Sequence, residues 1–218
     1  MLIYLQSGGQ PILIRLINGF LPNNRYKRTE LVEDCIPQFS LRVCTFSRIL
    51  KEKGIEDAIN AVKLVNDELG RDVFLLDIFG EVDNAQSDWF YNVLKCTPSY
   101  VRYCGIVPFD KSTSILKDYY ALIFPTYYSG EGFAGTLIDA LASGLPAIVS
   151  DWKYNKEIVQ DYETGIVYPA RDIGALAEKL LWIYHHQTEW NAMRYRCLKN
   201  ANDYMPEEAL KELELRLG

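Results

Sequence analysis

The chain has 218 residues, of which 49% are hydrophobic and 24% charged, and its formal net charge is -6. This composition is that of an ordinary globular protein and excludes a disordered or fibrous chain. The acidic balance provides no overall positive field for nucleic acid or an anionic membrane surface, so we expect no nucleic-acid partner. Any phosphate-binding site therefore has to be local.

The cysteines and the apolar segments indicate the compartment. Five cysteines lie far apart without a Cys-x-x-Cys pair, which predicts free thiols in a reducing compartment and no zinc site. No apolar run reaches about 18 residues, so no transmembrane segment is expected. The apolar N-terminal stretch has no basic residue before Arg15 and makes a poor signal peptide. These features predict a cytoplasmic protein.

Short β-type runs alternate with helical stretches along the chain. The expected strands are 12–17, 42–46, 73–79, 101–103, 121–124, 147–149 and 165–168, and several are continuous apolar runs typical of a buried parallel sheet. The expected helices are 55–69, 84–95, 112–119, 135–142, 172–184, 189–203 and 206–217. Asp172 and Thr188 are candidate N-caps.

This alternation predicts an α/β fold, a Rossmann-like doubly wound parallel sheet followed by C-terminal helices. We divide the chain into an N-terminal strand and linker (1–40), a Rossmann-like domain (41–186) and a C-terminal helical tail (187–218). The linker is expected because the segment before residue 40 is polar and contains prolines.

A glycine-rich loop between two expected strands is the most informative segment. It contains Gly130, Gly132 and Gly135 and precedes the expected helix 135–142. Glycines let the backbone approach a ligand closely, and the N–H groups at a helix N-terminus bind anions. The sequence therefore predicts an anion site at this loop.

Two carboxylates flank this loop and its helix. Glu131 lies in the loop and Asp139 in the helix, which at ~1.5 Å rise per residue places them on the order of 12 Å apart. That span suits the sugar and ribose ends of a nucleoside-diphosphate sugar. The alternative is that Glu131 is a solvated loop residue and Asp139 a surface helix residue.

Several motifs then resemble one family in the same order along the chain. Glu131-Gly-Phe-Ala-Gly-Thr-Leu-Ile-Asp139 resembles the Glu-x7-Glu signature of the family 4 (group 1) retaining glycosyltransferases. Phe46-Ser-Arg-Ile-Leu-Lys-Glu-Lys-Gly-Ile55 resembles their Gly-Arg-x-x-x-x-Lys-Gly loop. Leu76–Gly80, Tyr103–Pro108, Glu157–Val159 and Thr164–Pro169 fit further segments. The resemblance extends from about Arg42 to His185.

The resemblance implies the C-terminal, donor-binding domain of a GT-B glycosyltransferase, which transfers a sugar from a UDP-, GDP- or ADP-linked donor with retention. In this family Arg48 and Lys53 would stabilise the leaving phosphate, and Glu131 would contact the donor sugar. Asp139 would hold the ribose. The diphosphate would lie against the segment Gly132, Phe133, Ala134, Gly135 and Thr136, and the base beside Ile106 and Val107.

Two residues depart from the family pattern. Ser47 stands where the family has glycine before the arginine, and Asp139 stands where it has glutamate. An aspartate offers the same acceptor oxygens on a side chain one methylene shorter. We therefore expect the ribose contact to be shifted or mediated by water.

Other residues could in principle have functional roles, but most of them are expected to have structural roles or none. Without an Asp-x-Asp motif we expect no metal site and no cofactor beyond the substrate. His185 and His186 are expected to cap a helix C-terminus or lie at the surface. Tyr127, Tyr128 and Phe133 would either line a sugar pocket or anchor the loop, and the sequence does not separate these alternatives.

Two alternative functions remain at this point. Gly130, Gly132 and Gly135 also match Gly-x-Gly-x-x-Gly, and Asp151 lies where an NAD-dependent oxidoreductase has its ribose-binding acid. Alternatively, the chain is a non-catalytic half that needs a separate N-terminal acceptor domain, through which it could lie peripherally at the inner membrane face. The expected helix 206–217 has an apolar face that could mediate self-association.

Overall fold

The structure is a computed structural model, and it describes residues 3–7, 10–14 and 40–204. The N-terminal part contains an antiparallel pair, β1 (Ile3–Ser7) and β2 (Gln10–Ile14). Strand β2 covers positions 12–14 of the strand expected at 12–17, β1 has no counterpart in the prediction, and positions 15–17 lie outside the described residues. The helix expected at 206–217 and its role in self-association also lie outside them.

The main domain is built on a six-stranded parallel sheet in the order β5-β4-β3-β6-β7-β8. The strands are β3 (Leu41–Phe46), β4 (Phe74–Phe79), β5 (Val101–Gly105), β6 (Ala121–Phe124), β7 (Ala147–Ser150) and β8 (Gly165–Tyr168). Six of the seven expected strands thus form this sheet, with small changes at their ends. The predicted α/β, Rossmann-like fold class is confirmed.

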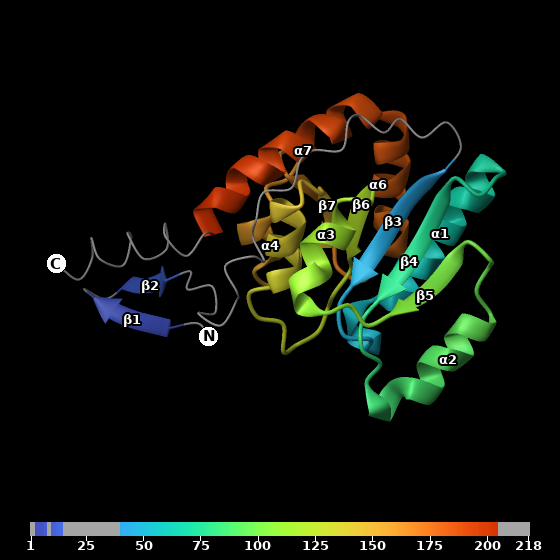
Figure 1. The fold of residues 1–218 in the computed structure, drawn as a ribbon, viewed down its shortest axis with the longest axis horizontal. Helices are drawn as coiled ribbons and strands as arrows, with labels where there is room; N and C mark the ends of the chain where they lie inside the picture. The colour runs from blue at the N-terminus through green and yellow to red at the C-terminus, as the bar shows by residue number, and fades with distance from the viewer. Residues whose placement is uncertain (1–2, 8–9, 15–39, 205–218) are drawn as a thin grey trace.

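Helices cover both faces of the sheet (Figure 1). One buried cluster joins the sheet to α1 (Ile55–Leu69), α2 (Ser87–Lys95) and α6 (Ile173–His185). The other joins it to α3 (Ser112–Leu116), α4 (Gly135–Ala142) and α5 (Asn155–Ile158). Helix α7 (Gln187–Ala201) contributes buried residues to both clusters, so this part of the predicted tail packs on the domain.

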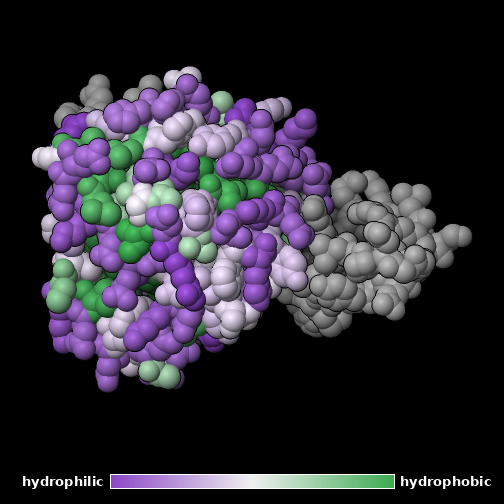
Figure 2. Space-filling view, turned by 180° about the vertical axis from the view of Figure 1, so that it is seen from behind, coloured by the Kyte–Doolittle hydropathy of each residue, from purple (hydrophilic) through white to green (hydrophobic). Residues whose placement is uncertain are grey.

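The outer surface of the helices is mostly polar. Seen from behind, hydrophilic side chains cover most of the domain and the apolar patches are separate (Figure 2). Helix α1 shows why, because Ile55, Ala58, Ile59, Val62 and Val65 are all buried and form one stripe toward the sheet.

Some helix ends differ from the sequence prediction for local reasons. Asp172 is the N-cap of α6, and its side chain accepts a hydrogen bond from the Ala175 N–H, as predicted. Thr188 is not an N-cap, because α7 already begins at Gln187 after His186. Helix α3 stops at Leu116 instead of 119, because the Asp118 and Tyr119 N–H groups donate to carbonyls three residues back.

Besides β1, three short elements have no counterpart in the prediction. They are α5 and the 3-10 turns Lys51–Lys53 and Phe109–Lys111. The helix expected from 84 begins as a 3-10 turn, Asn84–Gln86, before α2. Segments this short contain no complete apolar period that a sequence pattern could reveal.

A buried carboxylate network connects three elements of the sheet. Asp77 of β4 accepts hydrogen bonds from Arg42 (2.5 Å), Arg102 (2.9 and 3.1 Å) and the Tyr119 hydroxyl (2.8 Å). Burial alone would raise the pKa of Asp77, but these hydrogen bonds outweigh it and hold the pKa below its usual value. The Asp77 side chain is 2% exposed, whereas those of Arg42 and Arg102 are 46% and 60% exposed, so solvent screens the arginines.

We expect Asp77→Asn to lower the free energy of unfolding by about 2 kcal/mol at pH 7. Because the folded pKa is lowered, the carboxylate stabilises the fold fully above its unfolded pKa of about 3.9 and loses this effect as the pH falls through the folded value. Urea denaturation at pH 7 and at pH 3.5 should therefore show a smaller loss at the lower pH. Asp118→Asn, at an exposed turn, is the control. An equal loss at both pH values would contradict the assignment.

Candidate functional site

The candidate site lies where the order of the strands reverses. Strands β3 and β6 pair at the centre of the sheet, and the chain leaves them in opposite directions along it. In open α/β sheets the crevice at the carboxyl ends of two such strands is the usual place for a ligand. The loop after β3 contains Arg48 and Lys53, and the loop after β6 contains Glu131.

Lys53 and Glu131 meet across these two loops. The Lys53 Nζ lies 2.7 Å from Glu131 Oε2, and the side chains are only 12% and 9% exposed. The same carboxylate oxygen accepts a hydrogen bond of 2.7 Å from the Thr126 hydroxyl. The alternative that Glu131 is a solvated loop residue is therefore wrong, and Lys53 is not a solvated cation either.

The two loops touch through their backbones as well. Gly54 has a left-handed φ of 72°, and a Cβ placed on it would lie 2.3 Å from the carbonyl oxygen of Pro125. The Tyr127 N–H donates to the Glu52 carbonyl at 2.8 Å. Glycine is needed at 54 because no side chain fits between the loops, and this close approach places Lys53 beside Glu131.

Arg48 differs from Lys53 in its surroundings. It is exposed, and within the described part of the chain its side chain makes no hydrogen bond or ion pair. The structure therefore brings Lys53 to Glu131 but leaves Arg48 as a solvated cation on the same loop.

The glycine segment leads directly into α4. Gly132 and Gly135 are exposed, Thr136 is half-buried and Ala134 is buried. Ala134 occupies the N-cap position of α4, and its side chain makes no capping hydrogen bond to the first N–H groups of this helix. Phe133 packs against Tyr204, with ring centroids 5.8 Å apart, which supports the anchoring role for this aromatic residue.

Asp139 lies inside the domain and not on its surface. It is buried, and its Oδ2 accepts a hydrogen bond of 2.7 Å from the Ser112 hydroxyl, whose oxygen also lies 3.0 Å from the Phe109 carbonyl oxygen. Asp139 thus holds the start of α3, which follows the segment of Ile106 and Val107 in the chain. Of these two, Ile106 is 67% exposed and Val107 is half-buried.

The end of β7 and the segment after it support the glycine loop through contacts that the sequence pattern does not predict. The Trp152 indole donates to the Tyr128 carbonyl at 2.8 Å, and the Ser150 hydroxyl donates to the Thr126 carbonyl at 2.6 Å. Buried Asn155 in turn donates to the Ser150 carbonyl at 3.0 Å. The first two contacts join residues 24 positions apart, so only the adjacency of β6 and β7 could have predicted them.

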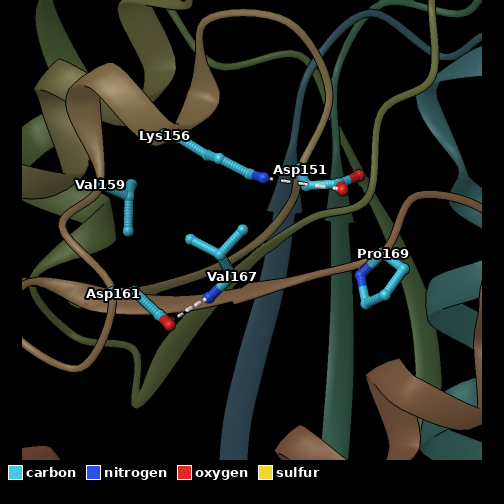
Figure 3. A pocket seen from close by; sticks show the side chains of 6 residues that line it. All are labelled: Asp151, Lys156, Val159, Asp161, Val167 and Pro169. Carbon is cyan, nitrogen blue, oxygen red and sulfur yellow. Dashed lines mark hydrogen bonds and ion pairs between the residues drawn. The ribbon is translucent and has the colours of Figure 1, made fainter.

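Asp151, the residue central to the oxidoreductase alternative, is engaged elsewhere. It lines a cavity of about 370 Å³ beside β8, where its carboxylate accepts from the Ala170 N–H at 2.9 Å and lies 3.7 Å from the Lys156 ammonium (Figure 3). In the same cavity Asp161 accepts a hydrogen bond from the Val167 N–H of the edge strand. The contacts of Asp151 are those of a residue that supports the end of β8.

Three further predictions concern metal binding, membrane spans and the two histidines. Among the described residues no group of three or more histidine, cysteine or acidic side chains could hold a metal ion. Within the same ranges no helix is long and apolar enough to cross a membrane. His185 ends α6, and His186 caps it with a ring nitrogen 2.9 Å from the Trp182 carbonyl, as predicted.

Curated proteins with known names resemble part of the chain. One is the GtfA subunit of the UDP-N-acetylglucosamine–peptide N-acetylglucosaminyltransferase of Streptococcus agalactiae, 34% identical over 60% of this chain and 24% of that protein. Another is the capsular polysaccharide biosynthesis glycosyltransferase CapM of Staphylococcus aureus, 31% identical over 61% of this chain and 34% of that protein. The chain thus spans a quarter to a third of the length of these relatives.

A solved structure shows the same fold. The C-terminal domain of the group 1 glycosyl transferase LpcC from Francisella tularensis matches with a TM-score of 0.69 at 15% identity, over 84% of this chain and 96% of that domain. The model of the family described as glycosyl transferases group 1 matches residues 36–203. The chain belongs to the group 1 glycosyl transferases.

Proposed function

We propose that this chain is the donor-binding half of a retaining glycosyltransferase and binds a nucleoside-diphosphate sugar between the loops after β3 and β6. The single observation that supports this most is the pairing of Lys53 with Glu131 at 2.7 Å, with both side chains largely buried. A cation and a carboxylate held at a strand-end crevice suit a ligand with a phosphate beside a sugar hydroxyl.

In the proposed complex Lys53 serves two partners. An ammonium group has three donors, so Lys53 can keep its contact with Glu131 and also donate to the donor's phosphate. Exposed Arg48 adds a second cation from the same loop. When the bond between the sugar and the phosphate breaks, negative charge develops on the phosphate, and preorganised cations stabilise that charge.

We propose roles for the other predicted residues as well. The segment Gly132–Thr136 would offer backbone N–H groups at the start of α4 to the diphosphate. Ile106 and Val107 would lie beside the base. Asp139 is 1% exposed, so a ribose contact would require the residues covering its carboxylate to move. Because a carboxylate accepts several hydrogen bonds, the bond from Ser112 could remain.

Transfer by this chain would require an acceptor site as well. Since the chain spans only a quarter to a third of its relatives, we propose that a separate N-terminal domain supplies the acceptor site. The 218 residues by themselves would bind a donor without transferring the sugar. UDP is the first nucleotide to test because the GtfA relative is named for a UDP-linked donor. The name of CapM favours a role in polysaccharide assembly.

Calorimetric titration of the 218-residue chain with UDP, GDP, ADP and NAD tests this proposal. We expect at least one nucleoside diphosphate to bind and NAD not to bind. Heat from NAD alone would favour the oxidoreductase alternative, and heat from none of the four would remove the proposed donor site.

A further inference from the structure

Two cations from the segments after β7 and β8 contact the loop after β6. We call residues 125–134 the donor loop. After β7, the Lys153 ammonium donates to the Ser129 carbonyl. After β8, the Arg171 guanidinium lies over the Tyr127 ring, 4.5 Å from its centroid. The donor loop is therefore held from outside at two of its residues.

Both cations have an unusual backbone. Lys153 has a φ of 44° and Arg171 a φ of 65°, and they are two of the three described non-glycine residues with positive φ. This left-handed conformation costs free energy for a side chain other than glycine, asparagine or aspartate. Glycine or asparagine would therefore suit these positions better if backbone conformation alone mattered.

The contacts of these side chains add too little folding free energy to account for the strained backbone at both positions. Lys153 and Arg171 are exposed. The hydrogen bond of Lys153 and the cation–π contact of Arg171 each gain free energy of the same order as the left-handed backbone costs. The net contribution of each residue to folding is thus close to zero. What the contacts do provide is a fixed position for the donor loop, which bears Glu131 and the glycines.

We propose that Lys153 and Arg171 are positioning residues that hold the donor loop in the conformation that binds the donor's diphosphate. This inference rests on the proposed function of the same loop. Neither residue touches the donor in this account. Lys153 acts through the Ser129 backbone and Arg171 acts through the Tyr127 ring. Without them the loop populates its binding conformation less often, and the apparent affinity falls in proportion.

The experiment compares stability with affinity in Arg171→Asn and Lys153→Asn, because asparagine tolerates the left-handed backbone. We expect an unchanged or higher Tm for each variant. We expect UDP, or whichever nucleoside diphosphate binds the unmodified chain, to bind about tenfold more weakly. Affinity for the bare nucleoside should not change, because the donor loop is placed at the phosphates.

Three further variants make the test specific. Tyr162→Asn is the matched control, because Tyr162 also has a left-handed φ of 57° but packs on Trp182, away from the donor loop. Its affinity for the nucleotide should be unchanged. Arg171→Lys should retain most of the affinity. Tyr127→Leu removes the ring without changing any charge, and combined with Arg171→Asn it should cost little more than either change alone.

Two results would overturn the inference. One is an unchanged diphosphate affinity in both asparagine variants. The other is an equal loss for the diphosphate and the bare nucleoside. If one variant does not fold, the other and Tyr127→Leu give the same readout. If the unmodified chain binds the nucleotide and the variants bind it equally well, only this inference is refuted. If the unmodified chain does not bind, the proposed function is refuted and this inference with it.

Discussion

Gly54→Ala is expected to lower the free energy of unfolding by about 3 kcal/mol, from a left-handed backbone and a steric collision together. Gly54 has a φ of 72°, and the added Cβ would lie 2.3 Å from the Pro125 carbonyl oxygen. The loops after β3 and β6 would have to separate, so Lys53 would move away from Glu131. Urea denaturation measures the first effect, and nucleotide titration of the folded fraction measures the second.

Gly70→Ala provides the matched control for this substitution. Gly70 has nearly the same backbone, with a φ of 66°, but nothing lies within 4 Å of its added Cβ. It should therefore show the backbone cost alone, about 1 kcal/mol, with no change in nucleotide affinity. Equal losses in the two variants would mean that the Pro125 contact has no energetic role.

Lys53→Ala is expected to weaken binding of a nucleoside diphosphate by about 100-fold, because it removes a largely buried cation from the phosphates and leaves Glu131 without its ion pair. The Lys53–Glu131 distance of 2.7 Å and the low exposure of both side chains make this pair the strongest electrostatic feature of the crevice. Calorimetric titration gives the change directly. The bare nucleoside should bind the variant as it binds the unmodified chain.

Lys51→Ala is the control from the same turn. Lys51 is an exposed lysine two positions earlier, and its ammonium lies over the Trp89 ring at 5.6 Å, not beside Glu131. Its removal changes the net charge equally but should leave the affinity within about twofold, because exposed charges are screened. If Lys51→Ala and Lys53→Ala weaken binding alike, overall charge and not the crevice governs binding.

Much of the fold could be predicted because most of its helices and strands are long enough to show a complete repeat of apolar residues. Helix α1 begins and ends where the apolar stripe from Ile55 predicts, and α4 and β8 also match their expected bounds. Ends set by hydrogen bonds within one turn, such as the stop of α3 at Leu116, could not be predicted. The strand order was equally inaccessible, so the network around Asp77, which depends on β4 lying between β3 and β5, was missed.

The candidate site also contains some contacts that could be predicted and others that could not. The resemblance to the glycosyltransferase family predicted that Lys53 and Glu131 serve one site, and the structure places them in contact. It gave no indication that Thr126 shares the Glu131 carboxylate or that Trp152 holds the Tyr128 backbone. Such supporting contacts depend on which loops are neighbours in space. The exposed position of Arg48 likewise follows from the local path of its loop and not from its motif.

The central claim is that the crevice between the loops after β3 and β6 binds the phosphates of a sugar donor. Its most direct test is the affinity of the unmodified chain for UDP relative to uridine, or for the corresponding pair if another base binds. The diphosphate should bind at least about 100-fold more tightly, because charge-assisted hydrogen bonds from Lys53 and the α4 N–H groups contact only the phosphates. Equal affinities for UDP and uridine would contradict this account.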